Sequence, residues 1–214
     1  MSYGKVTFWL DGRGVALNRG EWLHLDGLVS WAALYTAGDD IPEVPLADRG
    51  DFIEPKLPLE AVEVGGVRIY AASALFVDGD VLYTARWYRK RFNFDRASGV
   101  TSGTVLTGGG PYRDANQVTE VILCRSMVAY FDGDLKEVKR LLSFVGSLGK
   151  HRAMGFGRVT DISVEEISDD RSVAYEGRAM RYYPDPRGWR VVRPRPPYWN
   201  LTGAVNCLDP GDVI

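Results

Sequence analysis

The spacing of apolar and polar residues along the chain predicts two amphipathic helices. Between residues 24 and 36 the apolar positions recur every three or four residues, and Gly38 follows as a natural stop. The stripe of this first helix consists of Leu25, Leu28, Val29, Ala32 and Tyr35. A second helix is predicted after Asp134, because Asp134 and Glu137 have the spacing of a capping box. Its buried stripe consists of Leu135, Val138, Leu141, Leu142 and Val145.

Alternation with a period of two predicts strands around these helices. The first strand covers residues 5–10, and two more cover 67–77 and 81–89. Asp78-Gly79-Asp80 should join these two as a tight hairpin, because glycine supplies the positive φ of such a turn. Further strands are predicted at 119–131, 159–166 and 173–182. The resulting order is that of an α+β protein with a ferredoxin-like (RRM-like) βαββαβ unit.

Proline and glycine divide the chain further. Segments rich in these residues predict insertions at about 38–66 and 91–117 within a domain spanning residues 1–183. Residues 184–214 hold six of the eleven prolines and predict an extended Pro/Arg-rich tail, packed on the body through Trp189, Tyr198 and Trp199. We expect the second insertion to be mobile.

Composition places the chain among ordinary globular proteins. It has 214 residues, 45% of them hydrophobic and 25% charged, and two widely separated cysteines that form no metal-binding pair. We therefore expect no metal and no cofactor, and we expect Cys124 to be a core residue. No signal-peptide pattern and no apolar run near the ~20 residues of a membrane span is present, so a cytoplasmic location without a membrane partner is predicted.

Charge is unevenly distributed along the chain. The net charge is −2, but residues 39–63 hold eight acidic residues against two basic ones. Residues 86–96 hold five basic residues against one acidic residue, and residues 178–195 hold six against one. This asymmetry suggests one face for a polyanion and another for solvent or a protein neighbour.

The first basic segment interleaves cations with aromatic rings. Cations follow a phosphate backbone, whereas rings stack on unpaired bases, so this mixture suits single-stranded nucleic acid. The residues expected to contact RNA are Arg86, Trp87, Tyr88, Arg89, Lys90, Arg91 and Phe92. The alternative is a strand that buries its aromatic residues and leaves the cations solvated.

Residues 146–158, the glycine-rich segment, follow the second predicted helix. Glycines there would let backbone N–H groups approach a phosphate while cations supply charge. The candidate contacts are Lys150, His151, Arg152, Met154, Gly155, Gly157 and Arg158. The alternative is that Gly146 or Gly149 caps the helix and the charges are incidental. The spacing does not fit a mononucleotide or dinucleotide loop.

The sequence offers little for nucleophilic catalysis. It has no Gly-x-Ser-x-Gly elbow and only two histidines. We predict no catalytic residue; if there is one, it is His151, acting as a general acid or base in RNA cleavage. His24 is expected to be structural or to cap the first helix.

Several of these stretches resemble a known family. Residues 149–159, between the second helix and the strand that follows, resemble the glycine-rich loop of the RAMP superfamily of CRISPR proteins. Together with residues 23–28, the Tyr88-Arg89-Lys90 run and the chain length, they resemble the Cas5-like (Csf3) small subunit of type IV CRISPR effector complexes. The resemblance covers roughly residues 5–183.

This resemblance implies a noncatalytic subunit that binds the 5′ handle of CRISPR RNA during RNA-guided DNA interference. Its implied partners are a Cas7-like backbone subunit and a small large-subunit-like protein, with target DNA and a DinG-type helicase as further ones. The loop positions would be the handle contacts. Two alternatives stay open: a metal-independent endoribonuclease that processes CRISPR RNA, and a scaffold in the same complex that uses residues 39–63 and 91–117.

Overall fold

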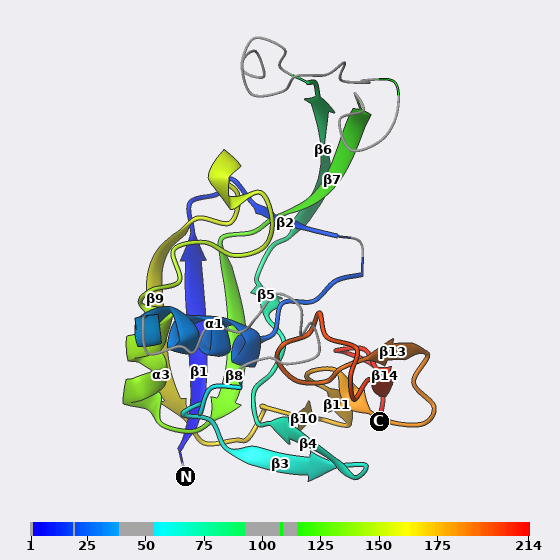
Figure 1. Cartoon of the computed structure of the whole chain (residues 1–214). Helices are drawn as coiled ribbons and strands as arrows, with labels where there is room; N and C mark the ends of the chain where they lie inside the picture. Colours follow the sequence, from blue (N-terminus) through cyan, green and yellow to red (C-terminus); the bar gives the residue numbers. More distant parts are fainter. Residues whose placement is uncertain (1, 19, 39–53, 93–107, 109–114) are drawn as a thin grey trace.

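The computed structural model describes residues 2–18, 20–38, 54–92, 108 and 115–214. Its main sheet has the strand order β5 (Phe76–Asp78), β8 (Ser126–Asp132), β1 (Tyr3–Leu10) and β9 (Val159–Ile167), with every neighbouring pair antiparallel. Helix α1 (Leu25–Ala37) lies between β1 and β5 in the chain, and helix α3 (Leu135–Leu142) lies between β8 and β9. Both helices lie across one face of this sheet (Figure 1). The α+β class is confirmed.

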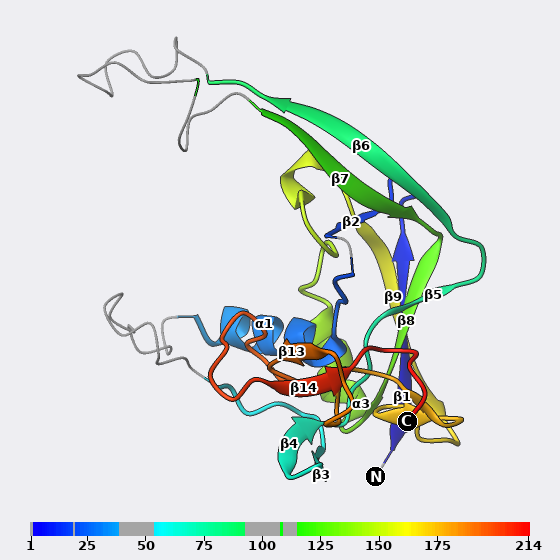
Figure 2. The same ribbon diagram turned by 90° about the vertical axis from the view of Figure 1, so that its right-hand side faces the viewer.

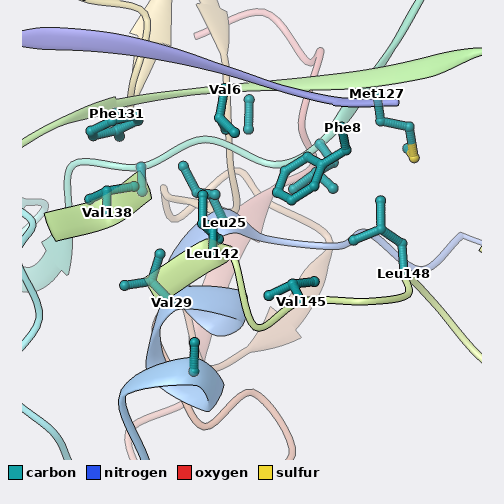
Figure 3. Packing of buried hydrophobic residues seen from close by; sticks show 14 of the residues in the cluster. Val6, Phe8, Leu25, Val29, Met127, Phe131, Val138, Leu142, Val145 and Leu148 are labelled. Carbon is teal, nitrogen blue, oxygen red and sulfur yellow. The ribbon is translucent and has the colours of Figure 1, made fainter. Parts of the chain in front are cut away.

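The hydrophobic core lies between the helices and the sheet. Val6 and Phe8 of β1 and Phe131 of β8 face Leu25 of α1 and Leu142 of α3 (Figure 3). All five residues are almost fully buried. Because each such side chain contributes about 1.5–3 kcal/mol when buried, this layer holds the sheet and helices together.

The local signals for the two helices differ in strength. The side chain of Asp134 accepts hydrogen bonds from the backbone N–H groups of Lys136 and Glu137, at 2.9 and 3.0 Å, so the predicted cap of α3 is confirmed. In α1, Tyr35 is 63% exposed and stacks on Trp31 at the outer surface, so its predicted place in the buried stripe is wrong. Among the described residues, no helix has the length and apolar character needed to cross a membrane.

A second sheet joins β2 (Val15–Leu17), β7 (Ala115–Leu123) and β6 (Leu82–Lys90), in that order. Strands β6 and β7 form a long ribbon that projects from the body (Figures 1 and 2). The predicted hairpin at 78–80 is wrong, because β5 pairs with β8 and β6 pairs with β7. The predicted strand at 119–131 is two strands, β7 and β8, which belong to different sheets.

Short strands complete the described chain. β3 (Ala61–Val64) pairs with β4 (Val67–Tyr70), and β10 (Ala174–Tyr175) pairs with β11 (Arg178–Ala179). The predicted single strand at 173–182 is therefore wrong: Glu176 and Gly177 both have positive φ and turn the chain back. The tail forms a sheet in the order β12 (Tyr183–Pro184), β14 (Val205–Leu208) and β13 (Arg190–Val192). The domain boundary at residue 183 stays a prediction, and most of both predicted insertions lies outside the described residues.

A buried ion pair fastens the tail to α1. The guanidinium of Arg181 lies 3.0 Å from the carboxylate of Asp26, and both side chains are fully buried. Tyr198 donates a 2.6 Å hydrogen bond to Asp26, so this tail residue packs on the body as predicted. Trp189 and Trp199 are each 70% exposed, so the expectation that they also pin the tail is wrong.

His24 packs beside this ion pair at the start of α1. Its ring lies 4.4 Å from the Tyr182 ring and 4.7 Å from the Tyr198 ring, measured between centroids. Neither ring nitrogen has a hydrogen-bond partner among the described residues. Its side chain makes no capping hydrogen bond, so its role is structural packing.

Candidate nucleic-acid interface

The glycine-rich segment closes on itself and packs against β2. The backbone N–H of Leu148 donates to the carbonyl of Gly157, and Ser147 pairs with Arg158 in an isolated β-bridge. The backbone N–H of Lys150 donates to the carbonyl of Ala16 at 2.8 Å. The segment is thus anchored at both ends, with a short 3₁₀ turn, Arg152–Met154, at its tip.

Close packing requires glycine at two positions of the segment, Gly149 and Gly157, and a positive φ favours it at Gly155 as well. A Cβ atom on Gly157 would lie 1.9 Å from the carbonyl oxygen of Leu148, and one on Gly149 would lie 2.5 Å from that of Ala16. Gly155 has a φ of 86° and lies under the Arg13 side chain. These contacts, together with positive φ at all three positions, exclude a larger residue without rearrangement.

Two expectations for the segment are corrected by this geometry. Helix α3 ends at Leu142, before the first glycine, so neither Gly146 nor Gly149 is its cap. The backbone N–H groups of Lys150, Met154, Gly155 and Gly157 already donate to carbonyl groups of the protein, so these four are not directed at a phosphate. The chemistry open to a polyanion here belongs to exposed side chains, namely those of Lys150, His151, Arg152 and Arg158.

The loop lies against one face of the β6–β7 ribbon. The Nε2 atom of His151 lies 3.2 Å from the Thr119 hydroxyl, and the His151 and Tyr88 rings are 5.5 Å apart. The Tyr88 ring also meets that of Phe156 edge-on. Arg86 pairs with Thr119 in the β6–β7 register, so it shares the face of the ribbon that carries Tyr88. Figure 2 shows the 3₁₀ turn beside β7.

Strand alternation separates Trp87 and Arg89 from this surface. Trp87 and Arg89 project from the opposite face of β6, where Trp87 is 73% exposed. Lys90 ends the strand, and Arg91 and Phe92 continue beyond it, away from the loop along the ribbon. The structure therefore brings Arg86 and Tyr88, but not Trp87 or Arg89, to the loop.

Sequence reasoning missed two charged residues at the interface, Glu21 and Arg13. Lys150 forms an ion pair with Glu21 at 3.2 Å, between two partly exposed side chains. Burial raises the pKa of Glu21, but hydrogen bonds from Asn18 and Lys150 outweigh it and hold the pKa below its ordinary value. Arg13 lies over Gly155 and is exposed. Its place between Gly12 and Gly14 was the available signal.

The basic tail segment has a different role from the one expected. Arg181 is fully buried on Asp26, and Arg190 binds Asp209 at 2.6 Å. Arg187 pairs with Asp185, and Arg193 is 3% exposed. These arginines are paired within the chain or buried, so the expected polyanion-binding role of 178–195 is not supported by their contacts.

The site has groups for electrostatic binding. No cluster of three or more His, Cys, Asp or Glu suited to a metal occurs among the described residues. Cys124 and Cys207 are both buried and free, and burial raises both pKa values, as expected for structural thiols. One polar atom stands out: the Tyr88 ring lies 5.5 Å from that of His151, and its buried hydroxyl has no hydrogen-bond partner among the described residues.

Antiparallel sheets with two helices and a cationic loop beside a projecting ribbon define an α+β protein with a basic candidate interface. The chain belongs to the family described as CRISPR type IV associated protein Csf3, whose sequence profile matches residues 4–210. It is thus a component of a type IV CRISPR complex, and the resemblance stated from the sequence is confirmed. No curated protein matches the chain.

Proposed function

We propose that the chain is a noncatalytic subunit that binds the 5′ handle of CRISPR RNA on the surface shared by the glycine-rich segment and β6. The observation that carries this proposal is their convergence: His151 contacts Thr119 and Tyr88 of the ribbon. Two segments that suit RNA for separate reasons, phosphate charge and aromatic stacking, thereby adjoin one another.

We also propose that the main sheet with α1 and α3 is a ferredoxin-like βαββαβ unit. In support, β1, α1, β5, β8, α3 and β9 follow one another in that pattern, with insertions. The sheet order β5-β8-β1-β9 puts the first and third strands of the unit in the middle. The glycine-rich segment then joins the second helix of the unit to its last strand.

Electrostatic contacts between exposed cations and RNA phosphates should make the affinity for RNA depend on salt. Lys150, Arg152, Arg158 and Arg86 are exposed and offer four cations to phosphates. Neutralising about four phosphates of single-stranded RNA gives a slope of log affinity against log salt near −3. Affinity should then fall about 50-fold when salt rises from 50 to 200 mM.

The test is the variant with Lys150, Arg152 and Arg158 all changed to alanine. Its salt slope should drop to about −0.7, so the same rise in salt should cost only about three-fold in affinity. The matched control changes Lys136, Lys139 and Arg187 to alanine, which removes the same charge from exposed positions elsewhere. If the loop variant keeps the wild-type slope and affinity for handle RNA, the proposal is wrong.

A second candidate function is metal-independent cleavage of the CRISPR RNA precursor. It is favoured by Tyr88, whose hydroxyl is unpartnered among the described residues and whose ring lies 5.5 Å from the imidazole of His151. Such a pair could serve as general acid and base. Labelled repeat RNA incubated with excess protein and EDTA should yield a 2′,3′-cyclic phosphate product that His151→Ala abolishes. Absence of any product rejects this candidate.

The partners proposed for the complex are a Cas7-like backbone subunit, a small large-subunit-like protein, target DNA and a DinG-type helicase, in the cytoplasm. Support comes from membership of the type IV family. Copurification of these proteins and of CRISPR RNA with the tagged chain from its native cell is the test. The scaffold alternative concerns residues 39–63 and 91–117, most of which lie outside the described part.

A further inference from the structure

The second sheet has a cavity on the face opposite the glycine-rich segment. Thr119, which contacts His151, alternates along β7 with Glu120 and Ile122, which line a cavity of about 370 Å³. Tyr83 of β6 lines the same cavity and pairs with Ile122 in the register. The ribbon therefore separates the candidate RNA surface from a second concave site, within the usual size range of ligand pockets.

The lining combines aromatic walls with an acidic rim. The rings of Trp22 and Phe76 meet at 55° with centroids 5.6 Å apart, which forms a corner, and the exposed Tyr83 stands at the mouth. Buried Leu75 and Met127 contribute to the apolar lining. Two of the described lining residues are charged, Glu21 and Glu120, and both carry carboxylates.

We propose that this cavity receives an arginine side chain of a partner polypeptide. A guanidinium stacks on aromatic faces and pairs with carboxylates, so it matches both features of the lining. The acidic rim disfavours a nucleotide, because the Glu120 carboxylate would repel a phosphate and Lys150 offsets the charge of Glu21 alone. The site thus docks protein on the face of the sheet that does not carry the glycine-rich segment.

Lys150 connects the two faces. Its ammonium group pairs with Glu21 on the rim of the cavity, 3.2 Å away. If RNA phosphate draws Lys150 away, as the proposed function implies, Glu21 loses its partner and becomes available to the incoming arginine. RNA binding and partner docking then favour one another, and the coupling acts equally in both directions.

The probe is N-acetyl-arginine amide, with N-acetyl-citrulline amide as its neutral isostere. The readout is the indole N–H signal of Trp22 in proton–nitrogen correlation spectra of the full chain, assigned with Trp22→Phe. The arginine amide should shift this signal in a saturable way, and the citrulline amide should not. Equal shifts with both compounds overturn the proposal, as does a larger shift with cytidine or adenosine monophosphate.

Variants of exposed charges test the electrostatic part. Glu21→Gln and Glu120→Gln should each weaken arginine amide binding about two- to five-fold, the size expected for exposed pairs. Lys150→Ala should strengthen it by a similar factor without RNA. The control Glu63→Gln removes an exposed carboxylate of β3, outside the cavity, and should change nothing. No effect of either rim variant rejects the site.

Handle RNA separates this inference from the proposed function. Bound RNA should strengthen arginine amide binding as Lys150→Ala does, and should add nothing in that variant. If Lys150→Ala strengthens binding but RNA does not, the cavity stands and RNA contact at Lys150 is refuted. If RNA binds at the loop but Lys150→Ala has no effect on the arginine amide, the coupling through Glu21 is refuted.

Discussion

The ion pair between Lys150 and Glu21 is weak enough for an RNA phosphate to replace Glu21. It joins two partly exposed side chains, and pairs of this kind contribute at most about 1 kcal/mol. A phosphate can therefore replace Glu21 at little cost. By contrast, the buried pair of Asp26 and Arg181 has no access to solvent and holds the fold together. Exposure distinguishes a cation that can bind RNA from one that cannot.

At the residue scale, His24 should make the protein less stable in acid. Burial, followed by the nearby charge of Arg181, lowers the pKa of His24 well below its ordinary value of 6.5. His24 of the unfolded chain thus binds a proton near pH 6.5, whereas His24 of the folded chain stays neutral. As the pH decreases below 6.5, the free energy of unfolding therefore decreases by up to about 1.4 kcal/mol per pH unit. His24→Phe keeps the ring and should remove this slope in urea unfolding between pH 7.5 and 5.5.

The matched control for this prediction is His151→Phe. This variant replaces the other histidine of the sequence, whose side chain is exposed, by the same residue. His24→Phe should also be at least as stable as the wild type at pH 7.5, since it removes two buried nitrogens without partners among the described residues. A wild-type slope in His24→Phe would refute the assignment.

At the scale of elements, local signals predicted α3 and β9 because each depends on neighbouring residues. Asp134 caps α3 as predicted, although Glu137 pairs with Arg140 and does not complete the capping box. The hairpin at Gly79 was wrong for the opposite reason: a turn residue permits a change of direction but does not choose the strand's partner. The pairing of β5 with β8 and of β6 with β7 depends on contacts that are distant in sequence.

The same limit applied to the candidate site. The sequence could identify the cations of the glycine-rich segment and the basic run from Arg86, but not that Tyr88 meets His151 while Trp87 faces away. It also assigned the glycines to phosphate contact, whereas Gly157 is required by the carbonyl of Leu148. A sequence shows glycine both where two backbone segments pack closely and where a backbone approaches a phosphate. The sequence alone therefore cannot distinguish these two roles.

Gly157→Ala should therefore destabilise the loop. A Cβ at this position would lie 1.9 Å from the Leu148 oxygen, and the φ of 64° is strained for alanine. We expect a loss of at least about 1–3 kcal/mol in urea unfolding and weaker binding of handle RNA. Gly146→Ala, which meets nothing within 4 Å, is the control and should change stability by less than about 0.5 kcal/mol. Equal losses in the two variants would contradict this account.

At the scale of the whole molecule, the positive charge divides between holding the fold and facing solvent. Arginines of the basic segment 178–195 are bound by their own chain: Arg190 by Asp209 and Arg181 by Asp26. The exposed cations of the loop remain on the surface beside the ribbon. A net charge of −2 is thus compatible with a local cationic surface, because much of the acidic charge lies elsewhere in the sequence.

The tail should depend on the buried pair. Arg181→Met leaves the Asp26 carboxylate buried without its cation, so we expect a loss of about 3–5 kcal/mol in the free energy of unfolding. The double variant Asp26→Leu with Arg181→Met removes both charges and should recover part of that loss, because no unpaired ion remains. Arg187→Met, at an exposed pair, should leave stability unchanged.

Hydrogen exchange distinguishes release of the tail from general unfolding. Arg181 also donates to the carbonyl groups of Ala72, ahead of β5, and of Pro194 in the tail, so the pair ties α1, the segment before β5 and the tail into one unit. In Arg181→Met, amides of β13 and β14 should lose protection before those of β1 and β8, which are paired in the main sheet. Simultaneous loss in both sheets would mean that the pair supports the whole fold and not the attachment of the tail.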